Sequence, residues 1–298
     1  MAVIGFIGLG IMGAPMARHL IRAGHDVRGF DVNADAVAGL AADGGTGATS
    51  SADAVRDAEV VITMLPADQH VEAVILGPDG VLMHARPGTL LIDMSTVSPQ
   101  TSRAVAAAGR ERGLRVLDAP VSGGETGAVE GVLSIMVGGE KDDFEAARPV
   151  LEALGRTIVH VGEHGAGQVV KAANQLVVAG IIALNAEALV LMEAAGVDPE
   201  PGLTVLNGGL AGSTVLTRKM SAFLKRDYTP GFRIDLHHKD MGIVLRAAEA
   251  AGVGLPLAGQ VSQLVAAARA AGMGSRDHSA LLEVIERLNG RTKENAHA

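Results

Sequence analysis

A short glycine-rich segment near the start of the chain restricts the fold more than any other feature. Residues 8–13 read GLGIMG, directly after the apolar run Val3–Ile7 and at the start of a stretch with helical periodicity. Such a segment joins strand to helix in a βαβ unit. The glycines Gly8, Gly10 and Gly13 would permit a tight turn, allow backbone to approach a pyrophosphate and let the helix pack closely. The segment predicts a dinucleotide-binding α/β fold.

Short apolar runs alternate with helical stretches over the first half of the chain. This alternation is typical of a parallel, doubly wound sheet, and predicts a Rossmann domain over residues 1–162. The predicted strands are Val3–Ile7, Val27–Phe30, Val60–Leu65, Thr89–Met94, Arg115–Asp118, Val132–Val137 and Thr157–Val161. The predicted helices between them include Ile11–Ala23, Ala34–Ala42 and Gln100–Arg112.

The pattern changes at the glycine-rich joint 162–167, after which we expect an all-α domain over residues 163–290 and a polar tail over 291–298. Gln168–Ala195 reads as one long helix that is apolar nearly all round, which suits burial between domains or subunits. We therefore expect a homodimer or homotetramer. Further helices are predicted over Pro199–Leu206, Ser213–Lys225, Asp235–Ala251, Pro256–Ala271 and Asp277–Leu288.

Composition excludes several other classes of protein. Hydrophobic residues make up 48% of the chain, but it has only five Phe, one Tyr and no Trp. The scarcity of aromatic residues and the net charge of −8 argue against a nucleic-acid-binding surface, which needs aromatic rings for stacking and stripes of basic residues. The absence of cysteine excludes thiolate chemistry. Leu176–Leu184 is too short for a membrane span of about 20 residues, and no basic region precedes the first apolar run, so we expect a cytoplasmic protein.

Asp31 strengthens the prediction of a dinucleotide site. It ends the second predicted strand, close to the distance after the glycines at which a carboxylate binds a ribose hydroxyl. A carboxylate there would repel the 2′-phosphate of NADP, and the adjoining Val32 and Asn33 provide no arginine to bind it. We therefore expect NAD(H) to be preferred over NADP(H). The alternative is an ordinary βαβ turn without a ligand.

Two further segments suggest chemistry. Ser122, Gly123 and Gly124 follow a predicted strand, where a hydroxyl and free backbone N–H groups suit an anionic carboxylate. Lys171 and Asn174 lie three residues apart on the long helix and so share one face. Burial would lower the pKa of such a lysine and allow it to transfer a proton. The alternative without a ligand is that Ser122–Gly124 is an ordinary turn after a strand. Lys171 and Asn174 would then be polar residues in the solvated first turn of a helix.

Four segments together resemble the β-hydroxyacid dehydrogenase family, which includes 3-hydroxyisobutyrate dehydrogenases. They are GFIGLGIMGAPMA (5–17), DAPVSGGETGAVEGVLSIMVGG (118–139), GEHGAGQVVKAANQ (162–175) and Lys239-Asp240, in order over nearly the whole chain. GGLAGSTVL (208–216), PGFRIDLHHKD (230–240) and DHSAL (277–281) more closely resemble the tartronate semialdehyde reductase branch, also called 2-hydroxy-3-oxopropionate reductase.

The resemblance implies a role for each matching residue. Lys171 matches the catalytic lysine, and Asn174 matches a neighbour that helps to hold the substrate. Ser122, Gly123 and Gly124 match the loop that binds the substrate carboxylate. The residues implied to bind the cofactor are Gly8, Gly10, Ile11, Met12, Gly13, Asp31, Met64, Leu65, Pro66, Thr96 and Lys239.

The expected reaction is the reduction of tartronate semialdehyde to glycerate by hydride transfer from NADH, with Lys171 as general acid and base. The alternative is a 3-hydroxyisobutyrate or general 3-hydroxyacid dehydrogenase. An imine reductase of related fold is less favoured because that group lacks the lysine, and a silent dinucleotide-binding sensor would leave Lys171 and Asn174 without a task. We expect no metal site, because the adjacent His237 and His238 point about 100° apart on a helix.

Overall fold

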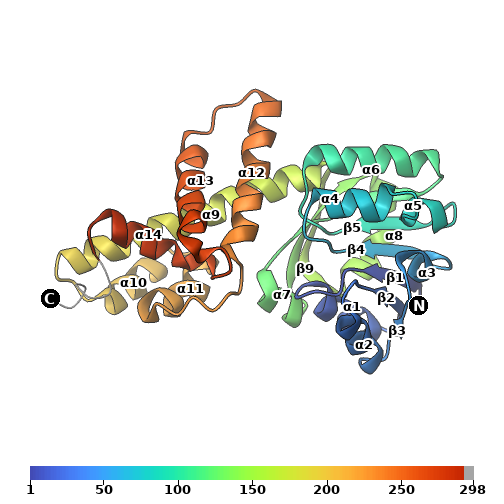
Figure 1. Ribbon diagram of the computed structural model, residues 1–298, viewed down its shortest axis with the longest axis horizontal. Helices are drawn as coiled ribbons and strands as arrows, with labels where there is room; N and C mark the ends of the chain where they lie inside the picture. The colour runs from blue at the N-terminus through green and yellow to red at the C-terminus, as the bar shows by residue number, and fades with distance from the viewer. Residues whose placement is uncertain (292–298) are drawn as a thin grey trace. The chain divides into compact units, whose positions relative to one another are not determined.

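The computed structural model describes residues 1–291, which form two compact units. The first unit covers residues 1–171 and contains the strands, and the second starts at Ala172 and is helical (Figure 1). This division falls inside a helix, α9 (Ala166–Ala194). The domain limits expected from the sequence stay a prediction, and the polar tail expected over residues 291–298 lies outside the described residues except for Arg291.

The first unit is built on a nine-stranded sheet in the order β3-β2-β1-β4-β5-β6-β8-β7, with β9 paired to β8. Neighbours from β3 to β6 are parallel, which confirms the doubly wound arrangement, whereas β8 runs antiparallel to β6 and β7. The strands are β1 (Val3–Ile7), β2 (Asp26–Phe30), β3 (Thr46–Gly47), β4 (Val60–Thr63), β5 (Leu90–Asp93), β6 (Arg115–Asp118), β7 (Val121–Ser122), β8 (Leu133–Gly139) and β9 (Gly155–Gly162).

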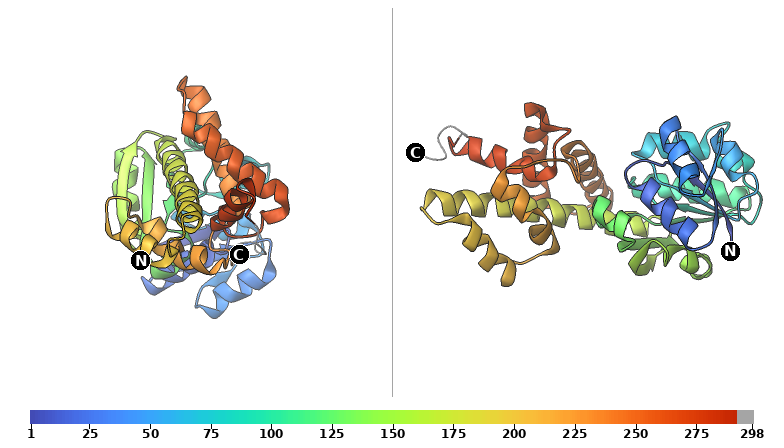
Figure 2. Two further views of the ribbon diagram at one scale, coloured as in Figure 1. Left: turned by 90° about the vertical axis from the view of Figure 1, so that its left-hand side faces the viewer. Right: turned by 90° about the horizontal axis from the view of Figure 1, so that it is seen from below.

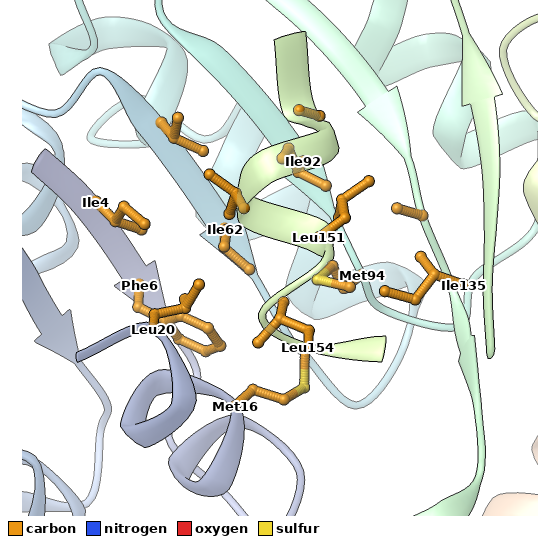
Figure 3. Packing of buried hydrophobic residues seen from close by; sticks show 14 of the residues in the cluster. Ile4, Phe6, Met16, Leu20, Ile62, Ile92, Met94, Ile135, Leu151 and Leu154 are labelled. Carbon is orange, nitrogen blue, oxygen red and sulfur yellow. The ribbon is translucent and has the colours of Figure 1, made fainter. Parts of the chain in front are cut away.

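Helices cover both faces of this sheet because successive side chains of each buried strand point to opposite faces. Ile4 and Phe6 of β1 pack with Met16 and Leu20 of α1 on one face (Figure 3), whereas Ile7 joins a separate cluster on the other. The helical elements are α1 (Gly13–Arg22), α2 (Ala34–Ala42), α3 (Ser51–Val55), α4 (Asp68–Val71), the π-helical turn η1 (Glu72–Leu76), α5 (Val81–His84), α6 (Pro99–Glu111), α7 (Gly124–Glu130) and α8 (Lys141–Leu151).

The second unit consists of helices (Figure 2), which pack around a mainly aliphatic core of their own. In the described part of this unit the β-pairing is one isolated bridge, between Arg233 and Asp277. After α9 the elements are α10 (Pro199–Gly208), α11 (Thr214–Lys225), α12 (Ile234–Ala251), α13 (Pro256–Ala268), the π-turn η2 (Arg269–Met273), the 3-10 turn η3 (His278–Ala280) and α14 (Leu281–Leu288). The all-α character expected from the sequence is confirmed.

Helix α9 satisfies, by length and composition alone, the criteria for a membrane span, with a mean hydropathy of 1.9 in its most apolar window. Buried core helices satisfy the same criteria. Ile182, Ala186 and Leu189 of α9 are fully buried in the core of the second unit, whereas Val177 and Leu184 are exposed. The helix is therefore a core element that also presents an apolar strip at the surface.

Candidate functional site

The glycine-rich turn between β1 and α1 packs tightly against the protein at its first and last glycines, whereas its middle glycine is uncovered. Gly8 has a φ of +97°, and a Cβ there would overlap the Met64 carbonyl oxygen. A Cβ on Gly13 would overlap the Gly8 carbonyl oxygen, whereas one on Gly10 would meet nothing within 4 Å. Ile11 is exposed and Met12 half-buried. This turn therefore presents uncovered backbone at Gly10, as a pyrophosphate requires.

Asp31 lies beside this turn. Its Oδ2 accepts a hydrogen bond of 2.7 Å from the backbone N–H of Leu9, and its Oδ1 accepts one of 2.8 Å from the N–H of Asn33. The half-buried carboxylate is thereby fixed next to the glycines. A carboxylate held at this position beside open backbone fits the ribose and pyrophosphate of a dinucleotide.

The loops that follow β4 and β5 are tied together at the carboxyl edge of the sheet. The Leu65 N–H donates to Ser95 Oγ at 2.8 Å. Asp93 Oδ1 accepts from Thr63 Oγ1 at 2.8 Å and from the Ser95 N–H at 3.1 Å. This network fixes the loops that contain the remaining first-unit residues expected to bind the cofactor. Of these, Met64, Leu65 and Thr96 are half-buried and Pro66 is exposed.

Two buried carboxyl groups lie side by side at the same edge. Asp93 and Asp118 end β5 and β6 and are register partners. Burial raises the pKa of Asp93 to about 6, against the hydrogen bonds from Ser95 and Thr63, and the charge of Asp118 raises it further. Burial also raises the pKa of Asp118. Asp93 Oδ2 has no hydrogen-bond partner among the described residues.

Asp118 anchors the first turn of α9 to the sheet. Its Oδ1 accepts from the Gly165 N–H at 2.7 Å, and its Oδ2 accepts from the Gln168 N–H at 3.1 Å. The Gln168 side chain donates to the Ser95 carbonyl oxygen at 2.8 Å and accepts from the Val97 N–H at 3.2 Å. The start of α9 is thus hydrogen-bonded to the loops at the ends of both β5 and β6.

Lys171 follows directly on this anchored turn and is 6% exposed. Its Nζ donates a hydrogen bond of 2.7 Å to the carbonyl oxygen of Val121, which directly precedes Ser122. Ser122 is half-buried, and Gly123 and Gly124 have φ values of +139° and +63°, a region that favours glycine. The structure therefore brings the expected catalytic lysine to the loop expected to bind the substrate carboxylate.

The remaining expected site residues belong to the second unit. Asn174 lies one helical turn after Lys171 on α9 and donates from Nδ2 to Gln175 Oε1 at 2.8 Å. Gln175 Nε2 donates to Asp240 Oδ2 at 2.6 Å. Lys239 Nζ lies 3.1 Å from Asp240 Oδ1, an ion pair without the alignment of a hydrogen bond. Within this unit Asn174 and Lys239 are therefore linked through Gln175 and Asp240.

Sequence reasoning assigned no role to several residues that hold this arrangement. Asp118 ends a predicted strand and Asp93 lies one residue before the end of another, positions that could have singled them out. Gln168 gave no such signal, because its partners are backbone groups from a distant loop. No group of three or more His, Cys, Asp or Glu residues among residues 1–291 could hold a metal ion.

Comparison with known proteins identifies the family. Residues 3–162 match the model described as the NAD binding domain of 6-phosphogluconate dehydrogenase, and residues 165–285 that described as NAD-binding of NADP-dependent 3-hydroxyisobutyrate dehydrogenase. The NAD-dependent L-serine dehydrogenase of Pseudomonas aeruginosa is 42% identical over 98% of this chain and 100% of its own. The 2-hydroxy-3-oxopropionate reductase of Escherichia coli is 40% identical over 95% of this chain and 97% of its own.

A solved structure agrees with these relatives. The structure of Mycobacterium tuberculosis 3-hydroxyisobutyrate dehydrogenase with L-serine has a TM-score of 0.87 and 39% identity, over 96% of this chain and 99% of that one. The expected closeness to the tartronate semialdehyde reductase branch is not distinct, because identity to that reductase is no higher than to the serine dehydrogenase. The chain belongs to the β-hydroxyacid dehydrogenase family and is an NAD(P)-dependent enzyme of that family.

Proposed function

We propose that the protein reduces tartronate semialdehyde to glycerate with NADH. The observation that carries the proposal is Lys171, a buried lysine whose Nζ donates to the Val121 carbonyl oxygen beside Ser122. Support for this substrate comes from the three second-unit segments that resemble the reductase branch. Two of them are in direct contact through His237 and His278, whose Nδ1 atoms are 3.0 Å apart.

The residues divide the chemistry between them. The nicotinamide cofactor supplies the hydride when it is bound. Lys171 donates a proton to the aldehyde oxygen, so that the carbonyl carbon gains a C–H bond, its oxygen gains an O–H bond and a primary alcohol results. Ser122 and the backbone N–H groups of Gly123 and Gly124 bind the substrate carboxylate. Asn174 orients the substrate from the next turn of α9.

Asp31 sets the preference for NADH over NADPH. Its carboxylate is held at the turn by Leu9 and Asn33 and cannot easily move away. A 2′-phosphate there would meet a fixed negative charge, whereas a 2′-hydroxyl could donate a hydrogen bond to it. The P. aeruginosa relative, described as NAD-dependent, is consistent with this preference.

The decisive experiment is the initial rate of NADH oxidation with tartronate semialdehyde, beside the rates of NAD reduction with L-serine and 3-hydroxyisobutyrate. We expect kcat/KM to be highest for tartronate semialdehyde. A higher kcat/KM for L-serine or 3-hydroxyisobutyrate would contradict the proposal and identify that compound as the preferred substrate. Lys171→Ala should still bind NADH but lose about 10²–10⁴-fold in turnover. Undiminished turnover in this variant would refute the role of Lys171.

We also propose that the enzyme is a cytoplasmic homodimer or homotetramer. Val177, Leu184 and Leu191 follow one another at seven-residue spacing on α9 and are 59%, 66% and 70% exposed. A strip of this spacing is typical of helices that pack against another helix. Light scattering should give two or four times the 30.3 kDa chain mass, and a mass of one chain at micromolar concentration would contradict the proposal.

A further inference from the structure

A pair of buried histidines lies in the second unit, at positions to which the proposed reaction assigns no role. His237 of α12 and His278 of η3 are 1% and 6% exposed. Their Nδ1 atoms are 3.0 Å apart, and their ring centroids are separated by 5.1 Å. Phe232 contacts both rings edge-on, at 5.5 Å and 5.4 Å. The two rings therefore pack against each other and against the ring of Phe232.

The position of each proton in this pair follows from its neighbours. His237 Nε2 lies 3.3 Å from the Gln175 carbonyl oxygen, which can only accept. His237 therefore carries its proton on Nε2 and accepts at Nδ1, so His278 must donate from its own Nδ1. Burial lowers the pKa of His278 far below its usual value, and His237 lowers it further, which leaves His278 neutral at neutral pH.

Two charged groups lie next to the pair, Asp277 and Lys219, and their effects on the pKa of His278 oppose each other. His278 Nε2 lies 4.0 Å from Asp277 Oδ1 and has no hydrogen-bond partner among the described residues. The Asp277 carboxylate is itself occupied by Lys219 Nζ at 2.7 Å and by the N–H groups of Gly231, Phe232 and Ser279. Asp277 thus fixes the turn from which His278 extends toward His237.

The chain of hydrogen bonds continues from His237 to Asn174. His237 and Asp240 lie three residues apart on α12, so one face of this helix contacts Gln175 twice, at its carbonyl oxygen and at its side-chain nitrogen. An ionised carboxylate only accepts, so the Gln175 nitrogen faces Asp240 and its oxygen faces Asn174. Asn174 then donates from Nδ2 to Gln175, and its Oδ1 is the end of the amide that can accept from a substrate hydroxyl.

We propose that the His237–His278 pair is a positioning element that holds Gln175, and through it the Asn174 amide, in the orientation that binds substrate. This inference rests on the proposed function, because it takes Asn174 as a substrate contact. His278 fixes the ring orientation and tautomer of His237, and His237 fixes α12 against α9 at Gln175. Without His278, the His237 ring can turn over and release the Gln175 carbonyl oxygen.

The test compares three variants in the second unit. His278→Leu keeps the volume but removes the donor, whereas His278→Asn places its side-chain nitrogen where Nδ1 was. Phe223→Leu is the matched control, since Phe223 is fully buried in the same core and makes no contact in the chain of hydrogen bonds. Because H278L loses one hydrogen bond, we expect its KM for the hydroxyacid or aldehyde to rise about 3- to 10-fold. Its kcat should stay within about twofold of the wild-type value. H278N should restore KM to within about twofold of wild type.

A second readout does not depend on turnover. The side-chain amide signal of Asn174 in a ¹H–¹⁵N NMR spectrum is identified by its loss in Asn174→Asp. It should move in H278L, return in H278N and stay in place in F223L. An unmoved signal in H278L, equal impairment of H278L and H278N, or the same effects in F223L would each overturn the proposal. If wild type turned over no hydroxyacid or aldehyde, the proposed function would fail, while the NMR signal would still decide the positioning.

A measurement on the unaltered protein covers the case in which H278L does not fold. Long-range ¹H–¹⁵N correlation spectra distinguish protonated from unprotonated ring nitrogens in wild-type enzyme. We expect the proton on Nδ1 of His278 and on Nε2 of His237. The opposite pattern would mean that His237 donates to His278 instead of to Gln175, and the proposed connection to Asn174 would be refuted.

Discussion

The buried carboxyl group of Asp93 offers a stringent test of the electrostatics at the edge of the sheet. Its pKa rises from an ordinary 3.8 to about 6 in the folded protein, chiefly through burial. For a carboxyl group, a raised pKa means that folding disfavours the ionised form. The wild type is therefore free of this cost below about pH 4 and bears it fully above about pH 6. The difference in pKa corresponds to about 3 kcal/mol, at about 1.4 kcal/mol for each pH unit.

Asp93→Asn removes the ionisation but keeps an oxygen that can accept from Thr63 and Ser95. We expect the free energy of unfolding of D93N, relative to wild type, to rise by about 2–3 kcal/mol between about pH 4 and pH 8. Any constant loss from the new amide cancels, because only the change with pH is compared. The assay is urea unfolding of both proteins across this pH range.

The control for this experiment is Asp53→Asn. Asp53 is an exposed carboxylate whose pKa is lowered by hydrogen bonds from the Thr49 backbone and side chain. A lowered pKa has the opposite sign, so D53N should lose stability relative to wild type, or show no change, as the pH rises. A D93N difference that does not vary with pH, or that falls toward alkaline pH, would refute the reasoning about Asp93.

Three further perturbations test separate parts of the structure. Gly167→Ala should destabilise the protein by about 1–3 kcal/mol in urea unfolding, because its Cβ would overlap the Met136 carbonyl oxygen and approach Asp118 Oδ2. Gly180→Ala on the same helix meets nothing within 4 Å and should stabilise by about 0.5–1 kcal/mol; equal effects would contradict the close packing at Gly167. Asp31→Ser should raise kcat/KM for NADPH relative to NADH by about tenfold or more. A wild type that already prefers NADPH would refute the role of Asp31 in cofactor preference. Leu184→Glu should yield a single-chain mass in light scattering, and an unchanged mass would exclude this strip of α9 as the subunit contact.

Much of the fold could be predicted because its signals are local. The sequence of β1, the glycine-rich turn and α1 indicates a strand, a turn and a helix within a single stretch. The continuous apolar run of α9 likewise predicted a helix whose ends shifted by only one or two residues. Short helices such as α3 and α5 escaped because four or five residues show no periodicity. The antiparallel direction of β8 was not predicted because its partner β7 has only two residues, too few to show a strand pattern.

The candidate site was less predictable, because its contacts join distant parts of the chain. Residue type and helical spacing suggested Lys171, but its partner is the carbonyl oxygen of Val121, fifty residues earlier. Side-chain identity says nothing about which backbone group a loop presents. The hydrogen bonds of Gln168 and the pairing of His237 with His278 depend in the same way on tertiary packing, so sequence patterns could not indicate them.

The hydrogen bond between His237 and His278 also constrains how the sequence can change over evolution. Each ring nitrogen satisfies the other, so replacing either histidine alone leaves a buried polar atom unpaired, at a typical cost of about 1–3 kcal/mol. Two residues 41 positions apart are therefore expected to be inherited as one unit. Relatives that lose one of these histidines should also have lost the other. Replacement of both by apolar side chains would leave no buried polar atom unpaired, and is therefore the substitution we expect most often.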